Sequence, residues 1–166
     1  MEALILPGKL DNLGLIRKYI KSAATEAGLE KKASYKLCLA VDEMATNIIT
    51  HGYDKNGLEG NISVEAKIDE KSLTVYIEDT ATPFDPTTKE PVTKEDLENR
   101  IKEGIPGGSG VYLVCQSVDK FIYEHIGNRN RNILIVGSPK YVTIEGKYPK
   151  IVCCSDVNNI SHFPTS

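Results

Sequence analysis

Two segments in the first third of the chain repeat apolar residues at the spacing of an amphipathic helix. In the first, apolar residues recur from Leu10 to Ala24, Asp11 or Asn12 can cap the start, and Gly28 is a stop signal. The second is expected to begin near Ala33-Ser34 and to end at His51-Gly52. Its apolar stripe consists of Leu37, Val41, Met44, Ala45 and Ile48.

Other segments alternate apolar and polar residues, the pattern of strands with one buried face. Ile62–Ile68 and Leu73–Ile77 alternate in this way around the turn Asp69–Ser72, which predicts a hairpin. Further strands are expected at Lys120–His125 and Asn132–Gly137, with Ile126–Arg131 between them. A short edge strand, Glu2–Leu6, is stopped by Pro7-Gly8.

The remaining segments are predicted to be connections. Asp54–Gly60 is polar and glycine-rich, and Thr80–Pro91 contains three prolines, so both are expected to be loops. Thr93–Glu103 is predicted to be a short, charged, exposed helix. A glycine-rich stretch, Gly104–Gly110, then leads into a helix at Val111–Ser117.

This order of elements predicts an α+β fold. Strands that meet as hairpins, with helices between the pairs, favour a two-layer sandwich: a mixed, mostly antiparallel sheet with helices packed on one face. We expect one domain over residues 1–137. Residues 138–166 form a C-terminal extension, either an added strand or a tail, and we assign it no function.

Composition narrows the function classes. The chain has 166 residues, which suits a single domain. Its net charge is −3 and its pI about 5.7, which disfavours nucleic-acid and anionic-membrane partners because both need a basic surface. The longest aliphatic run, Ile133–Val136, is far shorter than a membrane span, and no basic, apolar leader opens the chain.

The cysteines indicate a reducing compartment. Cys38 and Cys115 stand alone, Cys153 and Cys154 are adjacent, and no pair has zinc-ligand spacing. We therefore expect free thiols and a cytoplasmic location.

Glu43 and Asn47 are the first candidates for chemistry. They are four residues apart on the second helix, so they project side by side, about 100° round from the apolar stripe. A carboxamide oxygen suits Mg²⁺, which takes few protein ligands beside phosphates and water. The carboxylate can act as a general base. Taken alone, the pair is more typical of an exposed polar helix face.

Asp79 is the second candidate. It ends a predicted strand immediately before the proline-rich loop. A carboxylate at the mouth of a sheet can accept the exocyclic amine of adenine, and it selects that base because mismatched groups stay unpaired. Ordinary turn chemistry explains an Asp at this position equally well.

The glycine-rich stretch is the third candidate. Glycines let backbone N–H groups approach phosphate oxygens, and the helix that follows adds a favourable dipole. The stretch is neither a Walker A motif nor a typical Rossmann turn. A flexible hinge is the alternative.

Together, these three signals resemble the GHKL ATPase superfamily and its Bergerat nucleotide-binding fold. Within it, the chain is similar to the bacterial anti-sigma-factor serine/threonine kinases, from Leu4 to about Val136. The matching motifs are Leu39-Ala40-Val41-Asp42-Glu43 with Asn47 and His51-Gly52-Tyr53, Asp79 with Pro83-Phe84-Asp85-Pro86, Gly108-Ser109-Gly110-Val111-Tyr112-Leu113-Val114, and Val118-Asp119 with Tyr123-Glu124 and Asn132-Ile133-Leu134.

The resemblance implies a role for each motif. Glu43 falls on the general base, Asn47 on the Mg²⁺ ligand and Asp79 on the residue that recognises adenine. The remaining nucleotide-binding positions are Ala81, Gly107, Gly108, Ser109, Gly110 and Val111, and Thr87–Pro106 falls on the lid over ATP. The resemblance further implies ATP and Mg²⁺ as cofactors, phosphorylation of a serine on an antagonist protein, sequestration of a sigma factor, and a homodimer.

Two departures keep an alternative open. Ala81 stands where the family usually has glycine, which is tolerable unless φ is positive. Close relatives often carry an arginine near the second glycine box, and Pro106–Ser109 offers no cation, although Arg100, Lys102 or another chain can supply one. A nucleotide-binding module without phosphoryl transfer is therefore the second hypothesis. A histidine-kinase-type domain acting in trans ranks third, and His51 is interpreted as a structural helix-end residue.

Overall fold

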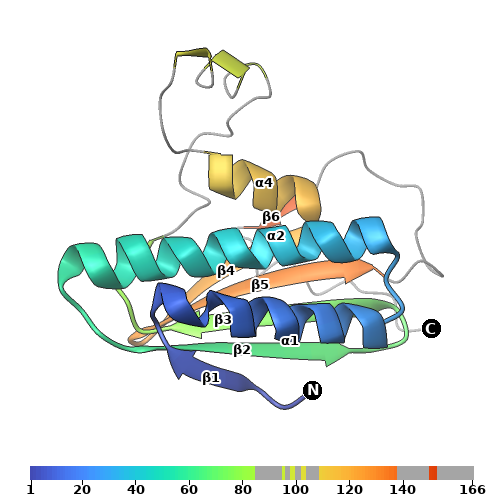
Figure 1. Cartoon of the computed structure of the whole chain (residues 1–166), viewed down its shortest axis with the longest axis horizontal. Coiled ribbons are helices and arrows are strands. Elements are labelled where there is room, and N and C mark those ends of the chain that lie inside the picture. The colour runs from blue at the N-terminus through green and yellow to red at the C-terminus, as the bar shows by residue number, and fades with distance from the viewer. Residues whose placement is uncertain (85–94, 96–97, 100–101, 104–108, 138–149, 153–166) are drawn as a thin grey trace.

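The computed structural model describes residues 1–84, 95, 98–99, 102–103, 109–137 and 150–152. Its strands are β1 (Leu4–Pro7), β2 (Asn61–Ile68), β3 (Ser72–Asp79), β4 (Lys120–Ile126), β5 (Arg129–Gly137) and β6 (Lys150–Val152). Its longer helices are α1 (Leu13–Glu26), α2 (Lys31–Asn47) and α4 (Ser109–Ser117). The helices lie on one face of a single sheet (Figure 1), which confirms the predicted two-layer α+β class.

The strands form one sheet in the order β1-β2-β3-β5-β4-β6. All neighbours are antiparallel except β6, which lies parallel to β4 at the far edge. The sheet is therefore mixed and mostly antiparallel, as predicted. The strand β6 lies within the segment 138–166, whose other residues lie outside the described part of the chain.

The core lies between the sheet and the helices. In β3, Leu73, Val75 and Ile77 are fully buried and alternate with half-buried residues. The helices contribute Ile20 of α1 and Leu37 of α2 to the same cluster. Burial of this one-sided apolar surface is the main force that holds the two layers together. Within the described residues, no helix is long and apolar enough to cross a membrane.

The second predicted helix does not end at His51-Gly52. It continues as a π-helix, η2 (Ile48–Tyr53), and then as a 3₁₀ turn, η3 (Asp54–Asn56), until Gly57 at φ 62° ends it. The prediction was wrong because Tyr53 is held in the protein interior. Its side chain is 1% exposed, and its hydroxyl donates a hydrogen bond to the Asn61 carbonyl at 2.8 Å. Tertiary burial thus overrides the local stop signal.

The last antiparallel pair is also longer than predicted. Strand β5 begins at Arg129, not at Asn132, and the turn is reduced to Gly127-Asn128, with Gly127 at φ 64°. The polar run at 129–131 conceals this extension. Its side chains are paired across the sheet, because Arg131 contacts both Glu78 at 2.9 Å and Glu124 at 3.6 Å.

The structure describes only part of the segments for which the remaining predictions were made. Helix α4 begins two residues before the predicted Val111. Of the predicted charged helix at 93–103, Glu95, Glu98, Asn99 and Lys102 are helical and exposed. Most of the predicted lid, Gly107, Gly108 and the two adjacent cysteines lie outside the described residues. Cys38 and Cys115 are free thiols, as expected.

Candidate functional site

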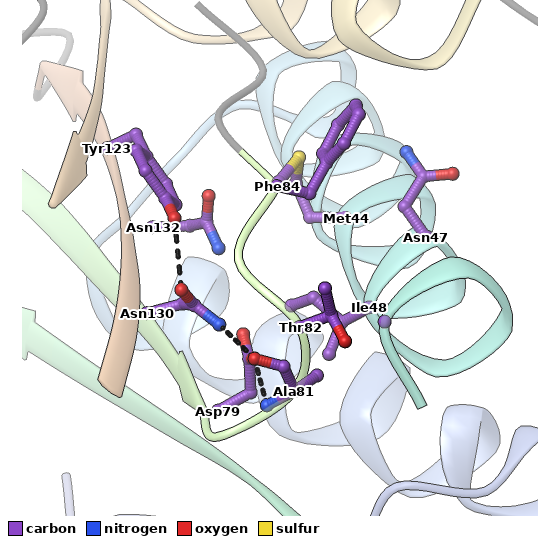
Figure 2. Close-up of a pocket in the computed structure, with 11 residues that line it drawn as sticks. Met44, Asn47, Ile48, Asp79, Ala81, Thr82, Phe84, Tyr123, Asn130 and Asn132 are labelled. Atoms are coloured by element: carbon purple, nitrogen blue, oxygen red, sulfur yellow. Dashed lines mark hydrogen bonds between the residues drawn. The ribbon is translucent and has the colours of Figure 1, made fainter. Parts of the chain in front are cut away.

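A pocket opens where helix α2 meets the end of the sheet. One wall consists of Met44, Asn47 and Ile48 from α2 and the start of η2. The opposite wall is built by polar side chains of β3, β4 and β5, and the segment after β3 lies between the two walls (Figure 2). The pocket thus joins a mostly apolar helix wall to a polar strand end, a combination typical of small-molecule sites.

Asp79 lies at the base of this pocket and is only 4% exposed. Its Oδ1 accepts hydrogen bonds from the Ala81 backbone N–H at 2.9 Å and from Nδ2 of Asn130 at 2.8 Å (Figure 2). The bond to Ala81 is the turn chemistry that the sequence left open. No hydrogen bond within the described residues engages Oδ2, so this oxygen can accept one from a ligand.

Burial raises the pKa of Asp79 above its usual range, while the hydrogen bonds from Asn130 and Ala81 oppose that rise. A low-dielectric surrounding disfavours the carboxylate, and donors that point at it favour the charged form. A ligand donor at Oδ2 would add to the second effect. The site therefore favours a ligand group that carries N–H or O–H donors.

Asn130 holds Asp79 in place, and sequence reasoning missed this residue. It is 3% exposed, and its Nδ2 donates to Asp79 and also to the Ala81 carbonyl at 2.9 Å. Its Oδ1 accepts from the Tyr123 hydroxyl at 3.0 Å and lies 2.9 Å from Nδ1 of His125. The one signal in the sequence was an asparagine in the polar run that was interpreted as a loop.

Asn132 is a second polar residue that β5 directs into the pocket (Figure 2). It is 3% exposed, and its Oδ1 is buried without a hydrogen-bond partner. The sequence motif included this residue only as part of a strand.

Glu43 and Asn47 meet the N-terminal turn of α4. Both are half-buried at the edge of the core, as their position on the helix predicted. A methyl group built on Gly110 would lie 3.0 Å from Oε2 of Glu43 and 3.2 Å from Nδ2 of Asn47. Residues far apart in the sequence thus come into contact, and a side chain at position 110 would crowd the ends of both polar side chains.

These two polar side chains fit a magnesium nucleotide. Neither makes a side-chain hydrogen bond within the described residues, so both can bind a ligand. In the described part of the chain, no group of three or more His, Cys, Asp or Glu side chains is arranged to hold a metal ion. One carboxylate and one carboxamide fit Mg²⁺, which fills its remaining positions with phosphate oxygens and water.

Ala81 fits its position without backbone strain. It is 4% exposed, and no residue other than glycine has a positive φ within the described chain. Its methyl group packs against the backbone of Gly52, where an added Cβ would approach it to 2.7 Å. The departure from the usual glycine is therefore accommodated by Gly52 at the end of the π-helix.

The other predicted positions lie at the start of α4 or in η2. Ser109 is the first residue of α4, and Val111 is half-buried within it. His51 is exposed in η2. Gly107 and Gly108 immediately precede the described part of α4.

Comparison with known proteins identifies the family of this chain. Residues 6–136 match the model of the histidine kinase-like ATPase domain. The serine-protein kinase RsbW of Listeria monocytogenes serovar 1/2a is 33% identical over 124 residues, which cover 73% of this chain and 78% of the relative. The protein of the same name from Bacillus velezensis is 27% identical, with 69% and 72% covered.

A solved structure confirms the fold. The histidine kinase domain from the blue-light activated histidine kinase of Erythrobacter litoralis EL346 matches with a TM-score of 0.52 at 16% identity. The match covers 78% of this chain and 61% of the solved chain. The chain belongs to the histidine kinase-like ATPase domain family, in the group that includes the RsbW serine-protein kinases.

Proposed function

We propose that this protein binds Mg-ATP and transfers the γ-phosphate to a serine of a small antagonist protein, and that it sequesters a sigma factor when the antagonist is absent. The observation that carries the proposal is the convergence of Glu43, Asn47 and Gly110 beside the Asp79 pocket. The similarity to proteins named serine-protein kinase supports the choice of reaction.

Asp79 and the α4 N-terminus have separate roles in binding. The free Oδ2 of Asp79 accepts the exocyclic amine of adenine, and the rigid Oδ1 contacts keep the carboxylate in position. Ala81 lies beside the adenine ring. Gly107, Gly108, Ser109, Gly110 and Val111 contact the phosphates through the backbone, where the helix N-terminus favours negative charge.

Glu43 is the general base of the transfer. Its carboxylate takes the proton of the substrate serine hydroxyl while the serine oxygen bonds to the γ-phosphorus. The bond from that phosphorus to the β–γ bridging oxygen breaks, and ADP leaves. Asn47 would hold Mg²⁺ through its carboxamide oxygen, and the ion would supply positive charge to the phosphates.

The proposed partners are proteins and not nucleic acid, in agreement with the net charge of −3. We place the protein in the cytoplasm and propose a homodimer. Strand β1 forms one edge of the sheet, and Ile5 on it is 62% exposed. An exposed strand edge is a suitable surface for pairing with a second copy.

Incubation with γ-labelled ATP and the antagonist tests the reaction. We expect acid-stable phosphoserine on the antagonist and its loss in Glu43→Gln, which keeps the shape of the side chain but removes the base. Calorimetry with ATP gives the control, because Glu43→Gln should still bind nucleotide. ATP binding without phosphoserine in the wild type would instead support a nucleotide-binding module, and acid-labile phosphohistidine would support a histidine-kinase-type domain.

A further inference from the structure

Asn132 is the one buried side chain in the described part of the chain with a polar atom that lacks a hydrogen bond. It lies on the helix-facing side of β5, opposite Ile77 on β3 and Tyr123 on β4. Its carboxamide lines the pocket that also contains Asp79 (Figure 2). Buried polar groups in folded proteins almost always have partners, so an exception in a pocket points to a missing ligand.

The sheet register sets the spacing between Asn132 and Asp79. Asp79 is opposite Asn130, so Asn132 is its diagonal neighbour on the same face of the sheet. Diagonal neighbours on antiparallel strands are roughly 7–8 Å apart. A planar base lying between the sheet and Met44 of α2 can contact both side chains at once.

The two side chains have complementary chemistry. The free Oδ2 of the Asp79 carboxylate can only accept hydrogen bonds, whereas a carboxamide both accepts and donates. The adenine edge formed by the exocyclic amine and N7 presents one donor and one acceptor, and an asparagine side chain matches this edge with two hydrogen bonds.

We propose that Asn132 is a second base-reading residue, an inference that rests on the proposed binding of ATP. Its Oδ1 accepts the hydrogen of the exocyclic amine that points toward N7, and its Nδ2 donates to N7. Asp79 accepts the other hydrogen of the same amine. Both amine hydrogens and N7 are then paired in a buried site, which selects adenine over bases that carry a carbonyl at this position.

Calorimetry with ATP and 7-deaza-ATP tests this assignment, because the analogue differs from ATP only in the loss of N7. We expect the wild type to bind 7-deaza-ATP about tenfold more weakly than ATP. We expect Asn132→Leu to bind ATP about tenfold more weakly than the wild type and to bind both nucleotides equally. Asn61→Leu, on the exposed start of β2, is the matched control and should behave as the wild type.

Thermal unfolding without nucleotide separates base reading from a structural role. Asn132→Leu should melt at the same or a higher temperature, because it replaces an unpaired buried carboxamide by an apolar group of similar size. Equal affinity of the wild type for the two nucleotides would overturn the assignment, whether or not the variant folds. Failure of the proposed function would give a different result, because the wild type would then bind neither ATP nor 7-deaza-ATP.

Discussion

Asn130 donates a hydrogen bond of 2.8 Å to Asp79 across the β3–β5 pair, and both side chains are almost fully buried. The carboxamide can take only one orientation, because its two hydrogens face the acceptors of Asp79 and Ala81 and its oxygen faces the Tyr123 hydroxyl. A network of hydrogen bonds through Asn130 therefore fixes the Asp79 carboxylate before any ligand arrives. Such preorganisation lowers the ordering cost of binding.

The substitution Asn130→Ala should weaken both folding and nucleotide binding. It leaves a buried carboxylate with one donor fewer, which costs about 1–3 kcal/mol of folding free energy. Chemical denaturation measures this loss, and calorimetry measures the affinity for ATP. Asn61→Ala removes an exposed strand asparagine and should change neither quantity. Unchanged stability in Asn130→Ala would mean that the network does not constrain Asp79.

The substitution Asp79→Asn should stabilise the ligand-free protein but weaken ATP binding. Burial raises the pKa of Asp79, so its contribution to stability is greatest below the unfolded pKa of about 3.9 and is lost as the pH rises through the folded pKa. Above the folded pKa the protein therefore carries the desolvation cost of the charged carboxylate, and an amide removes that cost. We expect a higher melting temperature at pH 7 and a difference that shrinks toward pH 4.

The same variant should bind ATP roughly 10- to 100-fold more weakly, because a hydrogen bond to a charged group contributes about 1.5–3 kcal/mol. Calorimetry at pH 7 provides the measurement. Tighter or unchanged binding of ATP would exclude Asp79 as the residue that recognises adenine.

The substitution Gly110→Ala should impair catalysis more than folding. Its methyl group would lie 3.0 Å from Glu43 and 3.2 Å from Asn47, at the ends of side chains that can move aside at low cost. Displacement of the Glu43 carboxylate lowers the rate of phosphoryl transfer, and we expect kcat to fall roughly 10- to 100-fold. Measured kcat with the antagonist protein tests this loss.

The control for this variant is Gly14→Ala on helix α1. Nothing lies within 4 Å of a methyl group at Gly14, in the first turn of α1, so the substitution should add no more than about 1 kcal/mol of stability through helix propensity and leave kcat unchanged. If both variants had the same kcat, Gly110 would not be constrained by the two polar side chains.

Gly52 and Ala81 should behave as a coupled pair. Gly52→Ala brings two methyl groups to 2.7 Å in a buried position, and overpacking of this kind costs about 1–3 kcal/mol. The double variant with Ala81→Gly removes the clash and should recover much of that loss. A double-mutant cycle by denaturant unfolding measures the coupling, and strictly additive effects would show that the two backbones relax independently.

The periodicity of the sequence predicted the main elements well because one face of each is buried. The alternation in β2 and β3 and the stripe of α2 both follow from that one-sided burial. The predicted ends of helices and strands were wrong where tertiary contacts outweighed local sequence signals. Tyr53 extends the second helix by packing under Gly8 and Gly60, and the paired polar side chains of β5 conceal the start of that strand.

The sequence by itself determined the order of the main elements and the α+β class and supplied candidate site residues, because periodicity and motif spacing are local properties of the chain. Only the tertiary structure decided which of those residues meet. The antiparallel register of β3 and β5 places Asn130 on Asp79 and leaves Asn132 unpaired in the pocket. The packing of α4 on α2 brings Gly110 to Glu43 and Asn47, since contacts between distant segments depend on how the layers fit and not on local sequence.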